Sequence, residues 1–300
     1  MPHFQPNIVC FGEMLWDVLP TGARPGGAPM NVAYHLKKLG AQPALISRLG
    51  RDDYGKGLMK LLVEHGLSTD FIQWDEEHKT GIVNAHPGPN NEVTYDIVAP
   101  VAWDFISMQD SFAALMQGAT YLVYGSLAAR NEVTKGTLLQ LLEGATTKVF
   151  DVNLRPPHFN KNIITQLLKG VAILKLNEDE LPLLADWFGD VTGAASRIKL
   201  LQDKFNIPTV IVTRGGAGAL LNVDGQLFEH KGYSVPVADT VGCGDAFLAG
   251  LLYQFNIGTA PQGTLNFASA LGALIATRSG ACPPYRKEEI NVIMHTGQSN

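Results

Sequence analysis

An aspartate that follows two glycines at the start of an apolar segment could carry out proton chemistry beside an anion. The stretch reads Asp239-Thr240-Val241-Gly242-Cys243-Gly244-Asp245. Residues 246–255 are mostly apolar and long enough for a helix. A helix that begins at such a turn directs free N–H groups and the positive end of its dipole at one point, which suits an anion. Asp245 either caps this helix or takes a proton from a hydroxyl next to a phosphate.

The order Gly-x-Gly-Asp before small residues is more specific than a lone helix cap. With it the chain resembles the ribokinase-like (PfkB) sugar kinases, whose C-terminal signature is similar to Asp-Thr-x-Gly-Ala-Gly-Asp. The resemblance implies that Gly242, Cys243 and Gly244 form an anion hole and that Asp245 deprotonates the sugar hydroxyl. Cys243 stands where the family usually has alanine.

Cys243 carries a separate hypothesis. A thiol at a helix N-terminus can have a lowered pKa, so that oxidation of this residue would block the phosphate pocket. The alternative is a small buried residue that replaces alanine. The other cysteines, Cys10 and Cys282, are far away in the sequence, which favours reduced thiols over a disulfide framework or a metal site.

A second stretch, near the N-terminus, combines a carboxylate with paired glycines. Asp17 follows a predicted first strand at 8–11 and lies among apolar residues, where a carboxylate is costly unless it is paired. It is either a turn or edge-strand residue or an acceptor for two sugar hydroxyls. Residues 26–40 predict a loop that enters a helix. By resemblance, Gly-Gly-Ala-Pro matches the family's N-terminal signature in its fructokinase branch, which implies that Asp17, Gly27 and Asn31 bind the sugar.

Polar residues also follow two later predicted strands. Asn153 and Arg155 come after a strand at 148–152. Open α/β sheets bind ligands at the carboxyl ends of their strands, so both residues are candidates for contact with sugar or phosphate.

Asn177 and Glu180 come after a predicted strand at 171–176 and begin a helix. Acidic residues at a helix start suit the dipole, which explains part of the pattern. Residues three apart can also face the same way, and their oxygens suit Mg²⁺, which keeps most of its water ligands. By resemblance, Asn-x-x-Glu is tied to magnesium and phosphate, with Glu180 acting through water and Asn177 near the nucleotide.

A glycine-rich turn separates two apolar runs within residues 210–220. Structurally it predicts a tight hairpin. By resemblance it is the nucleotide-binding turn Thr-x-Gly-x-x-Gly, so the expected ATP contacts are Thr213, Gly215, Gly216 and Gly218.

A helix rich in small residues is predicted at 265–277, and it could pack flat against adenine with Asn266 and Ser269 facing the base. In relatives, the region that follows this helix and the pair Asp239-Thr240 supply oxygens to a monovalent cation. Asp239 and Thr240 are therefore candidate ligands of K⁺.

Residues 50–57 nearly spell a phosphate-binding P-loop, but we reject that interpretation. Gly57 replaces the Ser or Thr whose hydroxyl would hold magnesium, and two aspartates occupy the loop. Asp53 is instead expected to cap the helix that follows.

Short β-type runs at 71–74, 80–85 and 92–98 interrupt the alternation of strands and helices, and the turn-rich residues 86–91 predict a hairpin. We expect a small β lid formed from about 13–26 and 70–102, which would exclude water when it closes over substrate. A surface hairpin without function is the alternative. The remaining strands and helices alternate, as in an α/β fold. With the resemblance, this implies a doubly wound, mostly parallel sheet with helices on both faces, in one ribokinase-like domain over residues 1–300.

Composition narrows the class of protein. The net charge is −5 without a basic run, which argues against a nucleic-acid partner, and no apolar stretch approaches the length of a membrane span. With no basic and apolar leader at the N-terminus, we expect a cytoplasmic protein. The resemblance implies an enzyme that binds a small sugar and ATP, and it is a candidate homodimer through the lid.

The resulting expectation is an ATP-dependent kinase that moves the γ-phosphoryl group to a primary hydroxyl of a sugar, with fructose favoured. Many fructokinases carry an arginine just after the lid, and residues 95–103 contain none. Ribose, 2-keto-3-deoxygluconate and nucleosides therefore stay open as acceptors. A catalytically silent sugar or nucleotide sensor is the alternative from another class, and the presence of Asp245, Asn177 and Glu180 argues against it.

Overall fold

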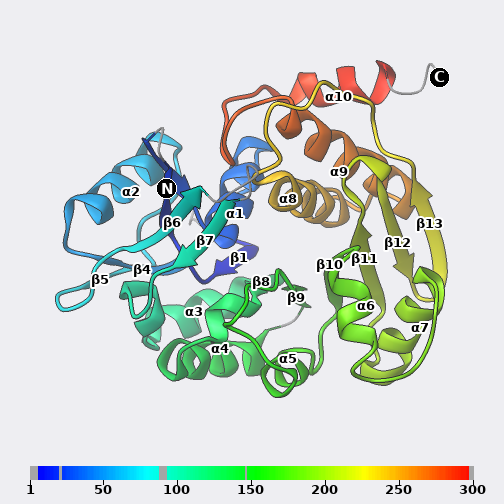
Figure 1. The fold of residues 1–300 in the computed structure, drawn as a ribbon. Helices are drawn as coiled ribbons and strands as arrows, with labels where there is room; N and C mark the ends of the chain where they lie inside the picture. Colours follow the sequence, from blue (N-terminus) through cyan, green and yellow to red (C-terminus); the bar gives the residue numbers. More distant parts are fainter. Residues whose placement is uncertain (1–5, 20–21, 88–92, 146, 297–300) are drawn as a thin grey trace.

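The computed structural model describes residues 6–19, 22–87, 93–145 and 147–296, and a nine-stranded sheet organises them (Figure 1). In spatial order its strands are β13 (Gln226–His230), β12 (Ala219–Val223), β11 (Thr209–Thr213), β10 (Ile173–Asn177), β9 (Thr147–Asp151), β8 (Tyr121–Gly125), β1 (Ile8–Phe11), β4 (Pro43–Gly50) and β5 (Ile72–Asp75). The pairs β11–β12 and β12–β13 are antiparallel and the other neighbours are parallel. The predicted mostly parallel sheet is confirmed.

Two hydrophobic cores cover the two faces of the sheet. Strand β1 shows why its residues are continuously apolar: Ile8 and Cys10 enter one core, while Val9 and Phe11 enter the other. The first core takes in α1 (Ala28–Lys38), α2 (Asp53–Glu64), α8 (Cys243–Asn256), α9 (Pro261–Ala276) and α10 (Lys287–Thr296). The second takes in α3 (Asp110–Gly118), α4 (Glu132–Gly144), α5 (Lys161–Leu167), α6 (Glu180–Ala185) and α7 (Ala194–Phe205). Figure 1 shows α8 and α9 on the opposite side of the sheet from α3, α4 and α5.

A separate four-stranded sheet, called the lid below after its expected role, has the order β3 (Gly22–Gly26), β2 (Leu15–Leu19), β6 (Gly81–Pro87) and β7 (Val93–Ile97). Strands β2 and β6 pair in parallel, and the two outer pairs are antiparallel. Figure 1 shows β6 and β7 near the β5 end of the main sheet, far from β13. Most of the hairpin turn expected at 86–91 lies outside the described residues.

One predicted lid segment is wrong. The run at 71–74 is part of β5, which pairs in parallel with β4 in the main sheet, with Ser47 opposite Ile72. Because β4, α2 and β5 follow one another, they form an ordinary strand–helix–strand unit, and the excursion into the lid begins only at β6.

The loop that resembles a P-loop starts helix α2, but its cap is Asp52 and not Asp53. Asp52 has extended backbone angles and accepts a hydrogen bond from Gly55 N–H at 2.8 Å. Asp53 is already in the first helical turn, where its carboxylate pairs with Lys56. An N-cap needs the extended backbone, so the cap falls one residue earlier than the sequence predicts. Short 3₁₀ turns, η2 (Ala102–Phe105), η3 (Ser126–Ala129) and η4 (Gly215–Ala217), complete the connections.

None of the helices in the described part of the chain is both long and apolar enough to cross a membrane.

Candidate active site

Asp245 lies in the first turn of α8, which begins at Cys243 after Gly242. Gly242 has a φ of 77°, and a Cβ there would lie 2.6 Å from Cα of Ala281, so only glycine fits. Among the described residues no side chain caps α8. Asp245 therefore does not fill the capping role that its sequence position allows. In the same turn the N–H of Cys243 donates to the carbonyl of Thr240 at 3.3 Å.

Asn31, 214 residues earlier in the sequence, donates from Nδ2 to Oδ2 of Asp245 at 2.8 Å. Asn31 is on α1 and only 4% exposed. Its Oδ1 contacts the Cys282 thiol, with Sγ at 3.3 Å. The N-terminal and C-terminal signatures thus meet through one direct hydrogen bond.

A buried ion pair, which the sequence did not predict, lies under this turn. Lys175 donates from Nζ to both carboxylate oxygens of Asp151 at 2.8 Å, and the two residues are 6% and 4% exposed. The Lys175 ammonium is also close to Gly244, 3.5 Å from where a Cβ would be. A lysine inside the apolar strand at 171–176 and an aspartate at the end of another apolar strand were the available signal, because buried charges are normally paired.

The electrostatic surroundings make Asp245 a stronger base than an exposed aspartate. Burial, followed by the charge of Asp151, raises the pKa of Asp245 to about 6. The hydrogen bond from Asn31 and the charges of Lys175 and Arg155 act in the opposite direction. A carboxylate with this pKa is ionised at neutral pH and still accepts a proton readily.

Asp17 and Arg155, two of the expected sugar-binding residues, lie within electrostatic reach of each other. Asp17 lies on β2, and its Oδ2 occupies the space beside Gly26, where a Cβ would lie only 2.5 Å away. Burial raises the pKa of Asp17, and the positive charge of Arg155 lowers it. The same arginine lowers the pKa values of Glu13 and Asp245. Arg155 therefore lies within electrostatic reach of all three carboxyl groups.

Asn153 places Arg155 through an unusual backbone. Its φ of 39° is in the left-handed region, which asparagine tolerates better than most residues. Its carbonyl accepts a hydrogen bond from Ser126 Oγ at 3.3 Å, and the next N–H, that of Leu154, donates to Oε1 of Glu180 at 2.7 Å. The loop after β9 is thus fastened at both ends, next to the carboxyl ends of β8 and β10.

Asn177 and Glu180 bind each other's backbone. Asn177 Oδ1 accepts from Glu180 N–H at 2.8 Å, and Glu180 Oε2 accepts from Asn177 N–H at 2.9 Å. Both oxygens of Glu180 therefore already accept a main-chain hydrogen bond, which suits contact with a metal through water better than direct ligation.

The charge of this cluster fits a hydrated divalent cation. When ionised, Asp151, Glu180 and Asp245 carry three negative charges, and Lys175 and Arg155 oppose them with two positive charges, which leaves one negative charge. Within the described ranges no group of three or more His, Cys, Asp or Glu side chains is placed to hold a metal by itself. Such a site fits Mg²⁺ that keeps its waters and binds phosphate oxygens.

In the glycine turn after β11, one glycine packs against backbone and two others lie next to open space. Gly218 has a φ of 87°, and a Cβ there would lie 1.9 Å from the carbonyl oxygen of His230, so its role is backbone packing. Around Gly215 and Gly216 no described atom lies within 4 Å of a Cβ position, which leaves room for a ligand. Thr213 ends β11, and its hydroxyl contacts the carbonyl of Leu176 at 3.4 Å.

The expected adenine helix begins earlier than predicted, at Pro261. Asn266 is partly exposed and accepts a hydrogen bond from Gln262 Nε2 at 2.9 Å. Ser269 is 8% exposed, and its hydroxyl is buried without a hydrogen-bond partner in the described part of the chain.

Asp239 lies at the junction between the lid and the anion hole. Its Oδ1 accepts from Val241 N–H at 3.1 Å, and its Oδ2 accepts from Gly280 N–H at 2.9 Å and from Arg24 Nη1 at 3.3 Å. Arg24 belongs to β3, so this ion pair ties the lid to the catalytic turn. Thr240, the next residue, is exposed. The sequence did not predict Arg24, since nothing in β3 marks a partner so distant in the chain.

The structure contradicts a lowered pKa for Cys243. Burial raises the pKa of this thiol to about 12, and the charges of Asp239 and Asp245 add to the effect. The sequence hypothesis considered the helix N-terminus but not burial, which is the largest cause, nor the two carboxylates. Burial also raises the pKa values of Cys10 and Cys282.

We expect the native protein at pH 7 to resist iodoacetamide and to keep its activity after brief treatment with peroxide, because thiolates are the reactive species. Intact mass and activity after treatment measure this, and urea-unfolded protein labelled at every cysteine is the control. Rapid labelling of Cys243 with loss of activity would contradict the expectation.

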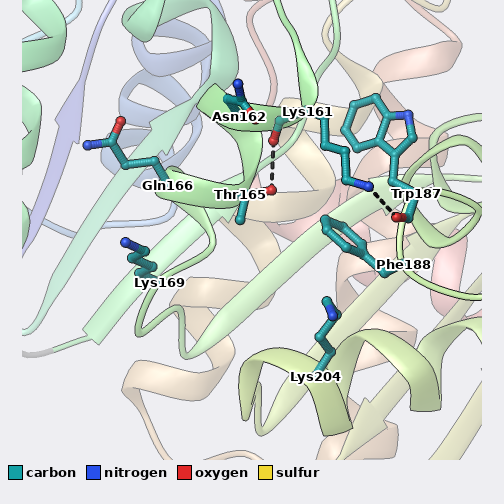
Figure 2. Close-up of a pocket in the computed structure, with 8 residues that line it drawn as sticks. All are labelled: Lys161, Asn162, Thr165, Gln166, Lys169, Trp187, Phe188 and Lys204. Atoms are coloured by element: carbon teal, nitrogen blue, oxygen red, sulfur yellow. Dashed lines mark hydrogen bonds between the residues drawn. The ribbon is translucent and has the colours of Figure 1, made fainter.

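Of two surface hollows, one lies beside the candidate site and the other lies away from it. One, of about 350 Å³, lies between the lid and the loop after α9 and is lined by Arg24, Pro25, Ser279, Gly280, Ala281 and Cys282. The other, of about 570 Å³, lies between α5, α7 and the end of α6 and contains none of the predicted site residues. Figure 2 shows Lys161 and Lys204 beside Phe188, while Lys169 lies farther away, near Gln166; Lys161 Nζ donates to the carbonyl of Trp187 at 2.6 Å. The larger hollow is therefore a basic depression outside the site.

Comparison with known proteins agrees with this geometry. A family model described as "pfkB family carbohydrate kinase" matches residues 5–288. A fructokinase of Klebsiella pneumoniae is 29% identical, with 94% of this chain and 97% of the relative covered. A 2-dehydro-3-deoxygalactonokinase of Haloferax volcanii is 27% identical, with 98% of both covered. The solved structure of a fructokinase with bound ATP from Xylella fastidiosa is 26% identical and superposes with a TM-score of 0.86 over 98% of this chain and 99% of that one. With a ribokinase-like fold and a match over almost its whole length, this chain belongs to the pfkB family of carbohydrate kinases.

Proposed function

We propose that the protein transfers the γ-phosphoryl group of ATP to a primary hydroxyl of fructose, with Asp245 as the general base. One observation carries the proposal: the Asp245 carboxylate lies in the first turn of α8, does not cap that helix, and is held by Asn31 from the expected sugar side. The site therefore combines a base with main-chain N–H donors at one point, which is what transfer of a phosphoryl group to a hydroxyl requires.

In this proposal each group of residues has one task. Asp17, Gly27 and Asn31 hold the sugar, and Asn153 and Arg155 border it. Asp245 takes the proton from the attacking hydroxyl, while the N–H groups of residues 242–244 stabilise the charge that develops on the phosphoryl oxygens. Thr213 and the turn at 215–218 border the ATP phosphates, and Asn266 and Ser269 face adenine.

Mg²⁺ would be held near Asn177 and Glu180 and would neutralise charge on the phosphates. K⁺ at Asp239 and Thr240 is a further part of the proposal. Because Arg24 already pairs with Asp239, we expect only modest activation by K⁺ over Li⁺.

Fructose is favoured because fructokinases recur among the relatives, and the structure offers one reason to compare it with an acidic sugar. Arg155 is exposed and positively charged beside Asp17, so it could pair with a sugar carboxylate. The relative from Haloferax volcanii is described as a kinase for such a sugar acid.

The test is ADP release with fructose, ribose, 2-keto-3-deoxygluconate and nucleosides as acceptors. We expect ADP release to depend on the acceptor and kcat/KM to be highest with fructose. A faster reaction with the keto acid would overturn fructose as substrate but keep the kinase activity. ATP bound without turnover in the presence of any acceptor would instead support a sensor.

The proposal includes a homodimer. Strands β3 and β7 are the edges of the lid sheet, and exposed edges can pair with a second copy, so we propose a homodimer through the lid. Sedimentation velocity tests it.

Free cysteines with raised pKa values fit a reducing, cytoplasmic location.

A further inference from the structure

Helix α1 carries Asn31, but its own sequence supplies no side chain to hold its start. The helix begins at Ala28, Pro29 follows, and the N-cap position is Gly27. A capping side chain cannot be added there, because Gly27 has a φ of 111° and a Cβ would lie 2.4 Å from the carbonyl oxygen of Glu13. The close approach that makes residue 27 a glycine therefore also removes the usual position for a cap.

Glu13, whose carbonyl oxygen lies against Gly27, also supplies the side-chain acceptor for the start of α1. Its Oε1 accepts the Ala28 N–H at 3.2 Å, from a residue that is only 3% exposed. The neighbouring Gly12 also lies against the helix start, since a Cβ there would be 3.0 Å from Cγ of Pro29. The segment after β1 thus packs against the start of α1 through backbone contacts and through the Glu13 side chain.

The position of this helix start determines where Asn31 meets the base. Asn31 N–H donates to the carbonyl of Gly27 at 2.9 Å, so Asn31 is one turn into the same helix. Its side chain then contacts Asp245 at 2.8 Å. A shift of the helix start would be transmitted directly to the hydrogen bond with the base.

The other carboxylate oxygen of Glu13 is in an unfavourable environment. Oε2 is buried and has no hydrogen-bond partner among the described residues. Burial raises the pKa of Glu13 to about 7, and the charge of Asp245 adds to the effect while Arg155 opposes it. A buried carboxyl group with a hydrogen bond to only one of its oxygens is unfavourable for folding. A glutamate at this position therefore points to a role in the site.

We propose that Glu13 is a positioning residue for phosphoryl transfer: its Oε1 holds the start of α1 and thereby fixes Asn31 against Asp245. The inference rests on the proposed function for its kinetic part only. It assigns the role to the reach of the acceptor oxygen and not to the charge.

Two conservative variants separate reach from charge. Glu13→Gln keeps an oxygen at the same distance without the charge, whereas Glu13→Asp keeps the charge on a side chain that is shorter by one methylene. Asn131→Ala is the matched control, since Asn131 caps the distant helix α4 by accepting from Val133 N–H at 2.9 Å. Each variant is measured for sugar-dependent ADP release, melting temperature and amide hydrogen exchange of residues 28–34.

We expect Glu13→Gln to keep kcat within about threefold of the wild type and Glu13→Asp to lose more than about tenfold, with faster exchange at the start of α1, because small displacements of catalytic groups are costly. Asn131→Ala should lower the melting temperature without changing kcat. An aspartate variant at least as active as the glutamine variant, or one with wild-type exchange in α1, would overturn the proposal. If the wild type lacks sugar-dependent turnover, the proposed function fails, and the exchange comparison still decides the role of Glu13.

Discussion

Asp245→Asn is expected to fold like the wild type and to lose about 10²- to 10⁴-fold in kcat, the usual effect of removing a general base. The amide keeps a hydrogen-bonding oxygen for Asn31, so the geometry of α1 and α8 is preserved while proton acceptance is lost. Steady-state ADP release in the presence of sugar measures the effect, and circular dichroism and melting temperature check the fold.

Asp203→Asn is the matched control, because Asp203 is an exposed residue on α7 that pairs only with Lys199 in the described structure. Its kcat should equal that of the wild type. A kcat for Asp245→Asn within tenfold of the wild type would remove Asp245 from the role of base. For the wild type, kcat/KM should rise with pH through about 6, since the base works only when it is deprotonated.

Lys175→Met is expected to destabilise the protein by about 3–5 kcal/mol, as breaking a buried ion pair by removing one partner usually does. The substitution leaves the Asp151 carboxylate buried without the two hydrogen bonds that it now accepts from Lys175 Nζ. It also removes the positive charge that now acts on Asp245 and Glu180. Urea unfolding measures the free energy of unfolding, and activity should fall as well because the anion hole loses a nearby cation.

Two comparisons test the cause of this loss. Lys204→Met replaces an exposed lysine of the basic depression and should change stability by less than about 0.5 kcal/mol, the usual range for the surface. The double variant Lys175→Met with Asp151→Leu should recover part of the stability, since no buried charge is then left unpaired. Equal stability of Lys175→Met and wild type would show that Asp151 is not destabilised by losing its partner.

The sequence was sufficient for those parts of the site that are continuous in the chain. The glycines and Asp245 predicted a helix start, with capping and proton transfer both open for the carboxylate, and runs of apolar residues predicted the buried parallel strands. Asp53 and the run at 71–74 were assigned wrongly for different reasons. The backbone angles of Asp52 placed the cap one residue earlier, and pairing with β4, about 25 residues away in the chain, placed the run in the main sheet.

The partners that meet across the chain could not be predicted in the same way. Asn31 and Asp245 were each identified, but their direct contact depends on the packing of α1 against α8. Glu13, Lys175 and Arg24 were missed because each has its partner in a distant segment. The raised pKa of Cys243 was missed for the same reason, since burial in the folded chain is its largest cause.

The most direct measurement is a crystal structure of the protein with fructose and a non-hydrolysable ATP analogue. We predict that the terminal phosphate contacts the N–H groups of residues 242–244 and that the primary hydroxyl of the sugar lies within hydrogen-bond distance of the Asp245 carboxylate. Nucleotide bound in the basic depression around Lys161 and Phe188, or a sugar hydroxyl directed away from Asp245, would contradict the account.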